Sequence, residues 1–412
     1  MRKFAKISLA AAVAVAGLTS VASAKPLEEA IKGVDATGYV TYRYNDTDVT
    51  SSLAADDETS TQQNVYKAAI ALTIPATDDV AVKVTGVTRS ALGGDIDGAS
   101  DTSIVHANFV YTGVEGLTVI AGKQAISTPW TQGSSHIDAT QYGTGAMALY
   151  NAGFATFAAA HFVSNNIAGT SDAAVDVRAN DITAVAAIVP IMDVATAQVW
   201  YANVGKGEND EETGANASAL PDGAKALVVS VDANIMDVAK VNFTHAELKG
   251  KGNNIAGLDI AKQKLDKLVV SANVGPAQLA AGYARGGSNG SLVAFDNDGS
   301  AGFKGWNVDA NSLAYPSIRA YMLKAGVDVM PSLNLSLTHV KAKSGKAENG
   351  VVAVDNEIEK HQETFAQLTY KHSSNLSAYI RYGKDKQVVD TDGATTTETK
   401  RDLGRLEVAF KF

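Results

Sequence analysis

The pentapeptide Gly-Gly-Ser-Asn-Gly at residues 286–290 has the spacing of a serine nucleophile elbow, the turn that presents a reactive hydroxyl in many esterases. Such an elbow needs a strand before the serine and a helix after it, and no helical pattern follows here. The seven histidines lack the H-E-x-x-H spacing of a zinc protease. Because the chain has no cysteine, it has no thiolate nucleophile and no Cys-based zinc site. These residues do not predict an enzyme.

Two pairs of aspartates are the next chemical candidates, because clustered carboxylates and carbonyls suit a hard cation such as calcium. The pairs are Asp95 with Asp97 and Asp296 with Asp298, and each is followed by glycine. Neither pair has EF-hand spacing, and Asp-Gly is also a common turn dipeptide. Calcium binding and a plain turn therefore both stay open, and no other metal or cofactor is expected.

The first 24 residues have the three parts of a secretory leader. They contain Arg2, Lys3 and Lys6, then an apolar stretch at residues 7–18, then Ala-Ser-Ala at residues 22–24, so we expect cleavage after Ala24. The apolar stretch is shorter than a membrane-spanning helix of about 20 residues. Removing the leader changes the net charge from −9 to −12, and such an acidic exported protein is not expected to bind nucleic acid.

From residue 34 onward the chain repeats one unit, a segment of about ten residues in which apolar and polar side chains alternate. That length is what a tilted strand needs to cross a bilayer. We count about eighteen such segments. They lie near residues 34–45, 63–74, 80–89, 102–112, 117–124, 145–151, 154–164, 181–189, 194–204, 224–234, 238–248, 266–274, 278–285, 318–329, 333–343, 362–371, 376–384 and 400–412.

The connections between these segments alternate between short and long. The long ones include residues 46–62, 205–223, 286–317, 344–361 and 385–399. Membrane barrels have tight periplasmic turns and long extracellular loops, and lipid admits strands only as a closed sheet. We therefore predict an all-β fold for residues 25–412, a transmembrane antiparallel β-barrel of about 18 strands. Helical spacing of apolar residues near 255–265 also predicts one short helix in a long loop.

One face of each segment is expected to meet lipid and the other to line a water-filled lumen. On segment 102–112, for example, Val105, Phe109 and Tyr111 should face lipid. The closing segment should pair with the first to remove the sheet edge, which leaves Phe412 against lipid. The predicted lumen-facing cations are Arg43, Lys67, Lys83, Arg89, Lys324, Lys371, Arg381 and Arg405.

The expected charges of the wall and of the outer loops oppose one another. The wall is mainly basic, whereas the loops carry acidic runs such as residues 56–58 and 208–212. Fixed charges in a low-dielectric wall select permeating ions, but salt screens fields beyond about 8 Å. We therefore expect weak ion selectivity.

Three stretches carry a family resemblance: PLEEAIKGVDATGYVTYRY at residues 26–44, VIAGKQAISTPW at residues 119–130, and the last segment with its terminal Phe412. They resemble the major outer membrane porins of Campylobacter and its relatives. AGKQ at residues 121–124 is also similar to the Gly-Arg-Gln element before the infolded loop of OprD-like porins. The resemblance implies a trimeric porin in outer-membrane lipid, with Phe412 as a signal for the insertion machinery.

The same resemblance implies that residues 125–143 fold into the pore as a constriction, with Trp130, His136, Asp138 and Tyr142 as its bulky or polar groups. The alternative is an ordinary external loop. Asp138 is the only carboxylate of this segment, so strong cation selection by it is not expected. The first functional hypothesis is a general diffusion porin for ions and small hydrophilic solutes. The others are a channel with a preferred substrate and a barrel adhesin or enzyme.

Overall fold

The computed structural model describes residues 33–52, 57–90, 100–138, 140–167, 181–205, 223–236, 238–250, 253–255, 258–259, 262–295, 299–311, 316–345, 357–391 and 394–412. The expected leader and both aspartate pairs considered for calcium lie outside these residues. Among the described residues, no helix is long and apolar enough to cross a membrane.

The described residues form strands joined by turns and loops. The first half contains β1 (Asp35–Ser51), β2 (Asp57–Pro75), β3 (Val80–Ser90), β4 (Ser100–Val114), β5 (Leu117–Ala125), β6 (Tyr142–Asn151), β7 (Thr156–Asn165), β8 (Ile182–Ile191), β9 (Ala195–Val204) and β10 (Lys225–Ile235). The second half contains β11 (Ala239–Lys249), β12 (Asn253–Ile255), β13 (Leu258–Asp259), β14 (Gln263–Val274), β15 (Ala277–Gly286), β16 (Arg319–Met330), β17 (Leu333–Lys343), β18 (Glu357–Lys371), β19 (Leu376–Thr391) and β20 (Ala394–Lys411).

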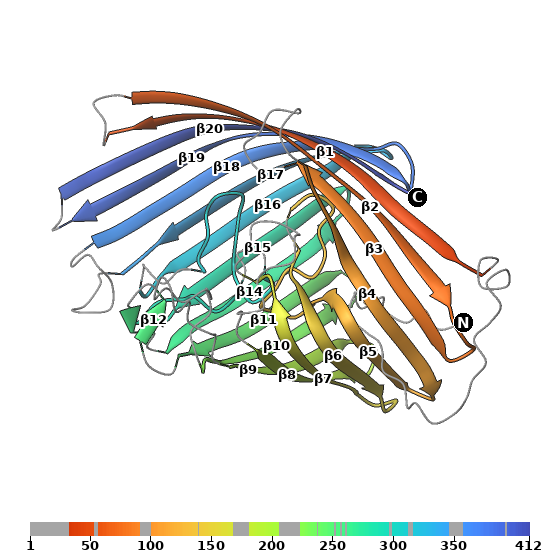
Figure 1. Cartoon of the computed structure of the whole chain (residues 1–412). Helices are drawn as coiled ribbons and strands as arrows, with labels where there is room; N and C mark the ends of the chain where they lie inside the picture. Colours follow the sequence, from red (N-terminus) through yellow and green to blue (C-terminus); the bar gives the residue numbers. More distant parts are fainter. Residues whose placement is uncertain are drawn as a thin grey trace, which may run out of the picture.

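Eighteen strands form one antiparallel sheet that closes on itself, as Figure 1 shows. Each strand pairs with its sequence neighbours, and β1 pairs with both β2 and β20. At the seam, the backbone of Gly38 exchanges hydrogen bonds of 2.9 and 3.0 Å with Phe412. Because closure leaves no sheet edge, the backbone groups are paired and the sheet can span lipid. The predicted barrel is confirmed.

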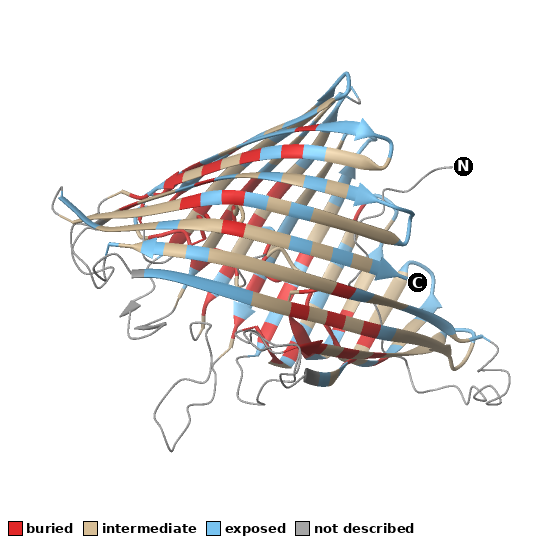
Figure 2. Cartoon of the chain, turned by 90° about the horizontal axis from the view of Figure 1, so that it is seen from above, coloured by how far each residue is buried: buried red, intermediate tan, exposed pale blue. Residues whose placement is uncertain are grey.

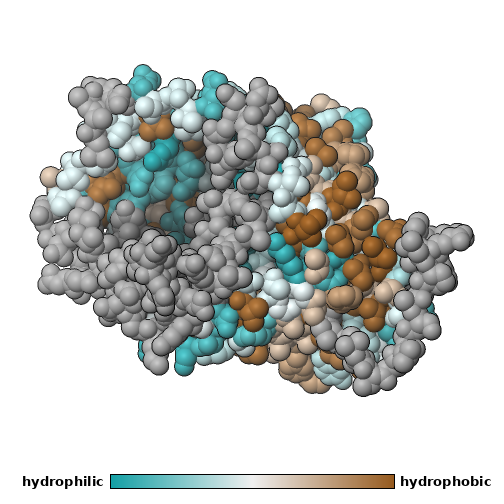
Figure 3. All heavy atoms as spheres, viewed as in Figure 1, coloured by the Kyte–Doolittle hydropathy of each residue, from teal (hydrophilic) through white to brown (hydrophobic). Residues whose placement is uncertain are grey.

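The two faces of the strands differ in polarity. Large apolar side chains on the outer face are exposed, among them Phe109 at 57%, Leu323 at 55% and Ile380 at 58%. Exposed and buried positions alternate along single strands (Figure 2), as expected when successive side chains point to opposite faces. Figure 3 shows a hollow with hydrophilic walls on one side of the view and hydrophobic outer wall on the other. The exposed apolar face is the one expected to meet lipid.

Five neighbouring strands are much longer than a membrane crossing requires. β1, β2, β18, β19 and β20 have 15 to 19 residues, whereas a tilted strand crosses the bilayer with about 10. The prediction of long loops at residues 46–62 and 385–399 is therefore wrong. Pairing continues there in polar sequence, since a strand that has left the membrane no longer needs an apolar face.

Two smaller expectations are also wrong. Val105 does not face lipid: a bulge opposite Thr85 and Gly86 turns it inward, where it is fully buried. The predicted helix near residues 255–265 is absent, because β12 and β13 pair as a small hairpin and β14 starts at Gln263. Short apolar runs do not distinguish helix from strand by spacing alone.

Candidate pore constriction

The loop between β5 and β6, residues 126–141 and here called L3, turns into the barrel. Its base closes through a 2.8 Å bond from the Ile126 amide to the Gln141 carbonyl. Its first turn is built by Thr131, whose hydroxyl accepts from the Thr128 amide at 3.1 Å and donates to the Ile126 carbonyl. Gly122, at φ +124°, precedes the loop, and a Cβ there would lie 2.3 Å from the Ala107 carbonyl. Only glycine fits this close approach.

Charged side chains of the wall hold the tip of L3 (residues 133–140). The Arg43 guanidinium donates to the Asp138 carboxylate at 2.6 Å and to Glu407 at 2.7 Å. The Lys67 ammonium, fully buried under the loop, donates to the carbonyls of Ser135 at 3.2 Å and Asp138 at 2.8 Å. Strands β1 and β2 thus fix the tip through charge-assisted hydrogen bonds, which are about twice as strong as neutral ones.

The electrostatics of the tip follow from these contacts. Burial raises the pKa of Asp138, but the hydrogen bond and charge of Arg43 outweigh it and hold the pKa of that carboxyl below its usual range. The pKa of His136 is lowered by burial and by the charges of Lys411 and Lys67. The tip is therefore anionic at Asp138 and neutral at His136 near pH 7.

Aromatic and amide contacts complete the attachment of L3. His136 packs edge-on against Tyr39 with ring centroids 4.7 Å apart, and Tyr142 packs likewise against His106 at 5.5 Å. Asn166 accepts from the Tyr142 amide at 2.6 Å. Tyr142 is only 6% exposed, so its ring packs the loop base and does not face open water.

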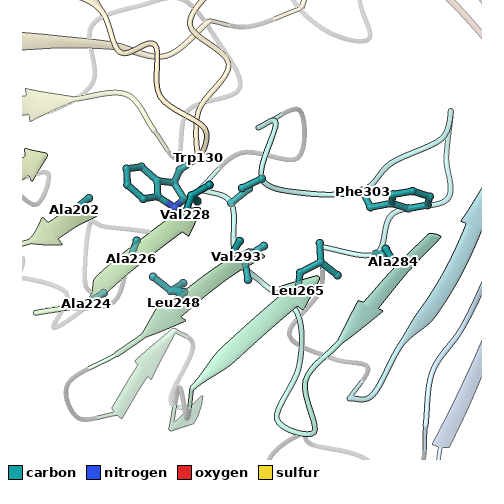
Figure 4. Close-up of a cluster of buried hydrophobic side chains, with 14 of the residues drawn as sticks. Trp130, Ala202, Ala224, Ala226, Val228, Leu248, Leu265, Ala284, Val293 and Phe303 are labelled. Atoms are coloured by element: carbon teal, nitrogen blue, oxygen red, sulfur yellow. The ribbon is translucent and has the colours of Figure 1, made fainter. Parts of the chain in front are cut away.

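Trp130 lies in an apolar cluster between L3 and the wall, as Figure 4 shows beside Val228. It is 1% exposed and stacks on Phe295 at 5.7 Å. The inner face of the neighbouring strands is lined here by small side chains such as Ala226 and Ala284, which let the loops approach closely. Trp130 therefore anchors L3, and the tip carries its lumen-facing polar groups.

A second loop enters the barrel, residues 287–318 between β15 and β16, here called L7. It contacts L3 through amides of Phe295 and Ala301, which donate to the Trp130 and Pro129 carbonyls at 2.8 and 2.7 Å. A wall carboxylate holds its far end: Glu363 is 2% exposed and accepts from the amides of residues 306, 307 and 308. The prediction of residues 286–317 as an external loop is wrong.

Two predicted lumen arginines gather at the end of L7. The guanidinium of Arg381 lies 4.9 Å from the ring centroid of Trp306, and that of Arg405 lies 5.2 Å from it. Arg381 also donates to Gln367 at 2.8 Å, and Arg405 donates to Asn45 at 2.7 Å. Trp306 thus orients two cations on the inner wall, close to the Arg43 and Glu407 pair.

The remaining predicted cations are spread over the inner wall. Lys324 is exposed on the lumen side of β16, and Lys371 is exposed at the end of β18. Lys83 is half-buried on β3, and Arg89 is buried near the top of that strand. Of the predicted cations, Arg43, Lys67, Arg381 and Arg405 contact the infolded loops directly, and the charge of Arg89 also acts on Asp138 of L3. Among the described residues, no cluster of three metal-ligating side chains exists.

The groups that sequence reasoning missed are L7, Trp306 and Glu363. One signal was present: residues 287–318 contain Phe295, Phe303 and Trp306, an unusual apolar content for a loop in water. The inner positions facing that loop are alanines on several consecutive strands. Together these would have indicated a buried loop.

Comparisons with known proteins agree with this architecture. A family model described as Campylobacter major outer membrane protein matches residues 2–412. A comparison with curated proteins gave no match. Pseudomonas aeruginosa OccK2 (OpdF), solved in complex with glucuronate, superposes with a TM-score of 0.67 at 13% identity, covering 92% of this chain and 98% of that one.

Two further solved structures share the fold. A BenF-like porin from Pseudomonas fluorescens Pf-5 has a TM-score of 0.66 at 13% identity, over 92% of this chain and 98% of that one. Acinetobacter baumannii OccAB1 has a TM-score of 0.65 at 14% identity, over 95% and 99%.

Proposed function

The chain belongs to the Campylobacter major outer membrane protein family, and from this premise we propose that its lumen conducts ions and small hydrophilic solutes by passive diffusion. It is an outer-membrane channel for small solutes. The observation that supports passive conduction is the pair of infolded loops, which narrow a lumen whose remaining wall is polar. L3, within residues 125–143, is the proposed constriction, with His136 and Asp138 as its lumen-side groups.

The charges around the constriction support weak selectivity. Arg43 is neutralised by Asp138 and Glu407, whereas Arg381 and Arg405 keep their charge beside Trp306. The inner wall therefore stays mildly basic beside a loop tip whose one negative charge, on Asp138, is paired with Arg43. Because Arg43, Asp138 and Glu407 are in direct contact, their fields largely cancel along the pore.

A preferred substrate is the second candidate, and the two arginines favour a small carboxylate. Guanidinium groups bind carboxylates through paired hydrogen bonds. OccK2, which shares only the fold with this chain, was solved with a carboxylate sugar, glucuronate. A preferred carboxylate such as glucuronate would block or slow chloride current at concentrations where a neutral sugar does not.

Processing and assembly complete the proposal. We propose cleavage of the leader after Ala24, recognition of Phe412 by the insertion machinery, and assembly into a homotrimer. Phe412 is 52% exposed and stacks on Phe410 at 6.1 Å, so its ring is accessible on the outer face. Light scattering of the detergent-solubilised protein measures the oligomer directly.

Planar-bilayer recording of the purified mature protein tests the function. We expect stepwise conductance and, under a tenfold potassium chloride gradient, a cation-to-anion permeability ratio near unity. Stepwise conductance with a ratio far from unity contradicts the cancellation of charges. Absence of any steps would favour an adhesin or enzyme barrel instead.

A further inference from the structure

Four cations lie side by side on the outer face of the barrel, facing away from the lumen. They are Arg285 on β15, Arg319 on β16, Lys343 on β17 and Lys360 on β18, here called the basic row. The register pairs Arg285 with Arg319, Arg319 with Lys343, and Lys343 with Lys360. Their strands are adjacent in the sheet (Figure 1). Directly opposed residues have Cβ atoms about 5 Å apart, so these charges repel one another.

The outward direction follows from burial of the alternate residues. Ala284, Ala320 and Ala342, each next to a member of the row, are buried on the inner face. Arg285, Arg319 and Lys343 themselves are exposed. The row is therefore on the surface that meets lipid, and it is separate from the pore site.

The protein supplies little compensating charge. At one end, Asp266 stands opposite Arg285, but its carboxylate binds His245 at 2.6 Å and Lys264 at 3.1 Å. At the other end, Lys360 pairs with Asp390. The same Asp390 carboxylate also lies within reach of the charge of Lys343, so Lys343 and Lys360 share it. Within the described part of the chain, no ion pair joins Arg285 or Arg319 to a carboxylate. Four adjacent cations thus have one available carboxylate among them, which is costly unless an anion from outside the chain binds the rest.

The depth of the row identifies that anion. One residue pair below it on the same face, Tyr283 stands opposite Tyr321, and both rings are exposed. Below the tyrosines the apolar face begins at Leu323 on β16, and on β17 it begins at Leu337, below Lys341 and His339; both leucines are 55% exposed. Tyrosines on such a face mark the membrane interface, and this end carries the long loops, so it is the extracellular one. The basic row therefore lies above the acyl chains of the outer leaflet, closest to them at Arg285 and Arg319.

We propose that the basic row binds the phosphate groups of the phosphorylated glycolipid of the outer leaflet. Arginine matches phosphate with paired hydrogen bonds, and the opposed lysine adds a point charge on the next strand. The neighbouring tyrosines fix the depth at which the headgroup meets the row. Lipid bound here would hold the β15–β18 wall, on which L7 begins, at a constant height in the membrane.

Lipid binding by the purified full chain tests the proposal, with lipid A and its dephosphorylated form as probes and native mass spectrometry as readout. We expect wild type to bind the phosphorylated form roughly tenfold more tightly. The Arg319→Gln/Lys343→Gln variant should lose that preference. The matched control, Lys384→Gln/Lys400→Gln, removes the same charge from lysines already paired with Asp402 and Glu398, and it should keep the preference.

The possible results of this experiment distinguish lipid A from free phosphate and from another copy of the chain. Equal preference in wild type and the Arg319/Lys343 variant overturns the proposal, as does wild type that does not distinguish the two lipids. Displacement of lipid A by millimolar inorganic phosphate would assign the row to free phosphate. A change of oligomer size in the variant would assign it to another copy of the chain. Gel mobility with and without heating shows whether each variant is a folded barrel. We expect both variants to fold, because relieving like-charge repulsion does not destabilise the sheet.

Discussion

The tip of L3 and the loop L7 lie in the same lumen but are held by different interactions. The tip meets β1 and β2 through Arg43 and Lys67, which bind a carboxylate and backbone carbonyls. L7 meets the opposite wall through buried apolar residues such as Val293 and Val308, both at 0% exposure. The contact of the tip with the wall is thus mainly charged, whereas that of L7 is mainly apolar, with Lys267 and Glu363 as charged exceptions. A lumen can therefore contain a second apolar core where a loop covers its wall.

The largest effect is expected from a charge placed in the apolar contact between L7 and the wall. Val293→Asp buries an unpaired carboxylate, which costs on the order of 4 kcal/mol and should release L7 from the wall. Single-channel conductance should rise, and protease should cut within residues 287–318. Ser288→Asp, at an exposed position of the same loop, is the control and should change neither. Unchanged conductance in Val293→Asp would mean that L7 does not narrow the pore.

Glu363 is the carboxylate among the polar contacts on the L7 side, where Lys267 also donates to the carbonyls of Ser300 and Gly302. Glu363→Gln removes the charge that accepts three backbone amides and turns one acceptor into a donor, at a cost of about 2 kcal/mol. We expect Trp306 to loosen over Arg381, with noisier open-channel current. Tryptophan fluorescence should shift toward that of exposed indole, and an unshifted spectrum would show that Glu363 does not position this part of L7.

A smaller effect is expected at the charged tip. Asp138→Asn keeps the shape but removes the charge that Arg43 binds, and should weaken docking of the tip by about 1–2 kcal/mol, since the Asp138 side chain is 42% exposed and partly screened. Anion permeability should increase modestly in reversal-potential measurements. Asp402→Asn breaks an exposed pair on the outer face and should have no such effect. A shift toward cations would contradict the assignment.

The smallest effect is the pH dependence of the tip. The pKa of His136 is lowered, so neutral His136 favours docking above pH 6.5, and this contribution declines as pH falls below that value. The pKa of Asp138 is lowered too, so its contribution is complete above pH 3.8 and is lost only as pH falls further. Current noise should therefore rise in two steps as the pH is lowered. His136→Gln should remove the upper step and Asp138→Asn the lower; a reversed assignment would contradict the contacts.

The barrel was predictable because the membrane imposes a two-residue period wherever a strand crosses it. Segment 80–89, for example, is β3, Val80–Ser90. Outside lipid that constraint disappears, so Asp48 and Thr395 lie in parts of strands that the apolar–polar alternation does not predict. The bulge that turns Val105 inward is likewise a matter of cross-strand register and not of local pattern.

The contacts of the proposed constriction could be predicted only in part. The place of L3 followed from family resemblance, and its anchoring by Lys67 beneath the tip is a tertiary contact that spacing does not encode. L7 was missed because its burial depends on alanines from several strands meeting Phe295 and Phe303. Pairing between distant residues, here 363 with 306–308, becomes visible only once the sheet is closed.

Neighbouring residues of one strand are assigned to opposite faces, one toward the water-filled lumen and the next toward lipid. Lys324 and Leu323 on β16 test this assignment, because the chain has no cysteine to interfere. A membrane-impermeant, negatively charged thiol reagent should reduce the current through Lys324→Cys channels and leave Leu323→Cys channels unchanged. Block of Leu323→Cys channels, or equal response of the two variants, would contradict the lumen and lipid faces assigned to this barrel.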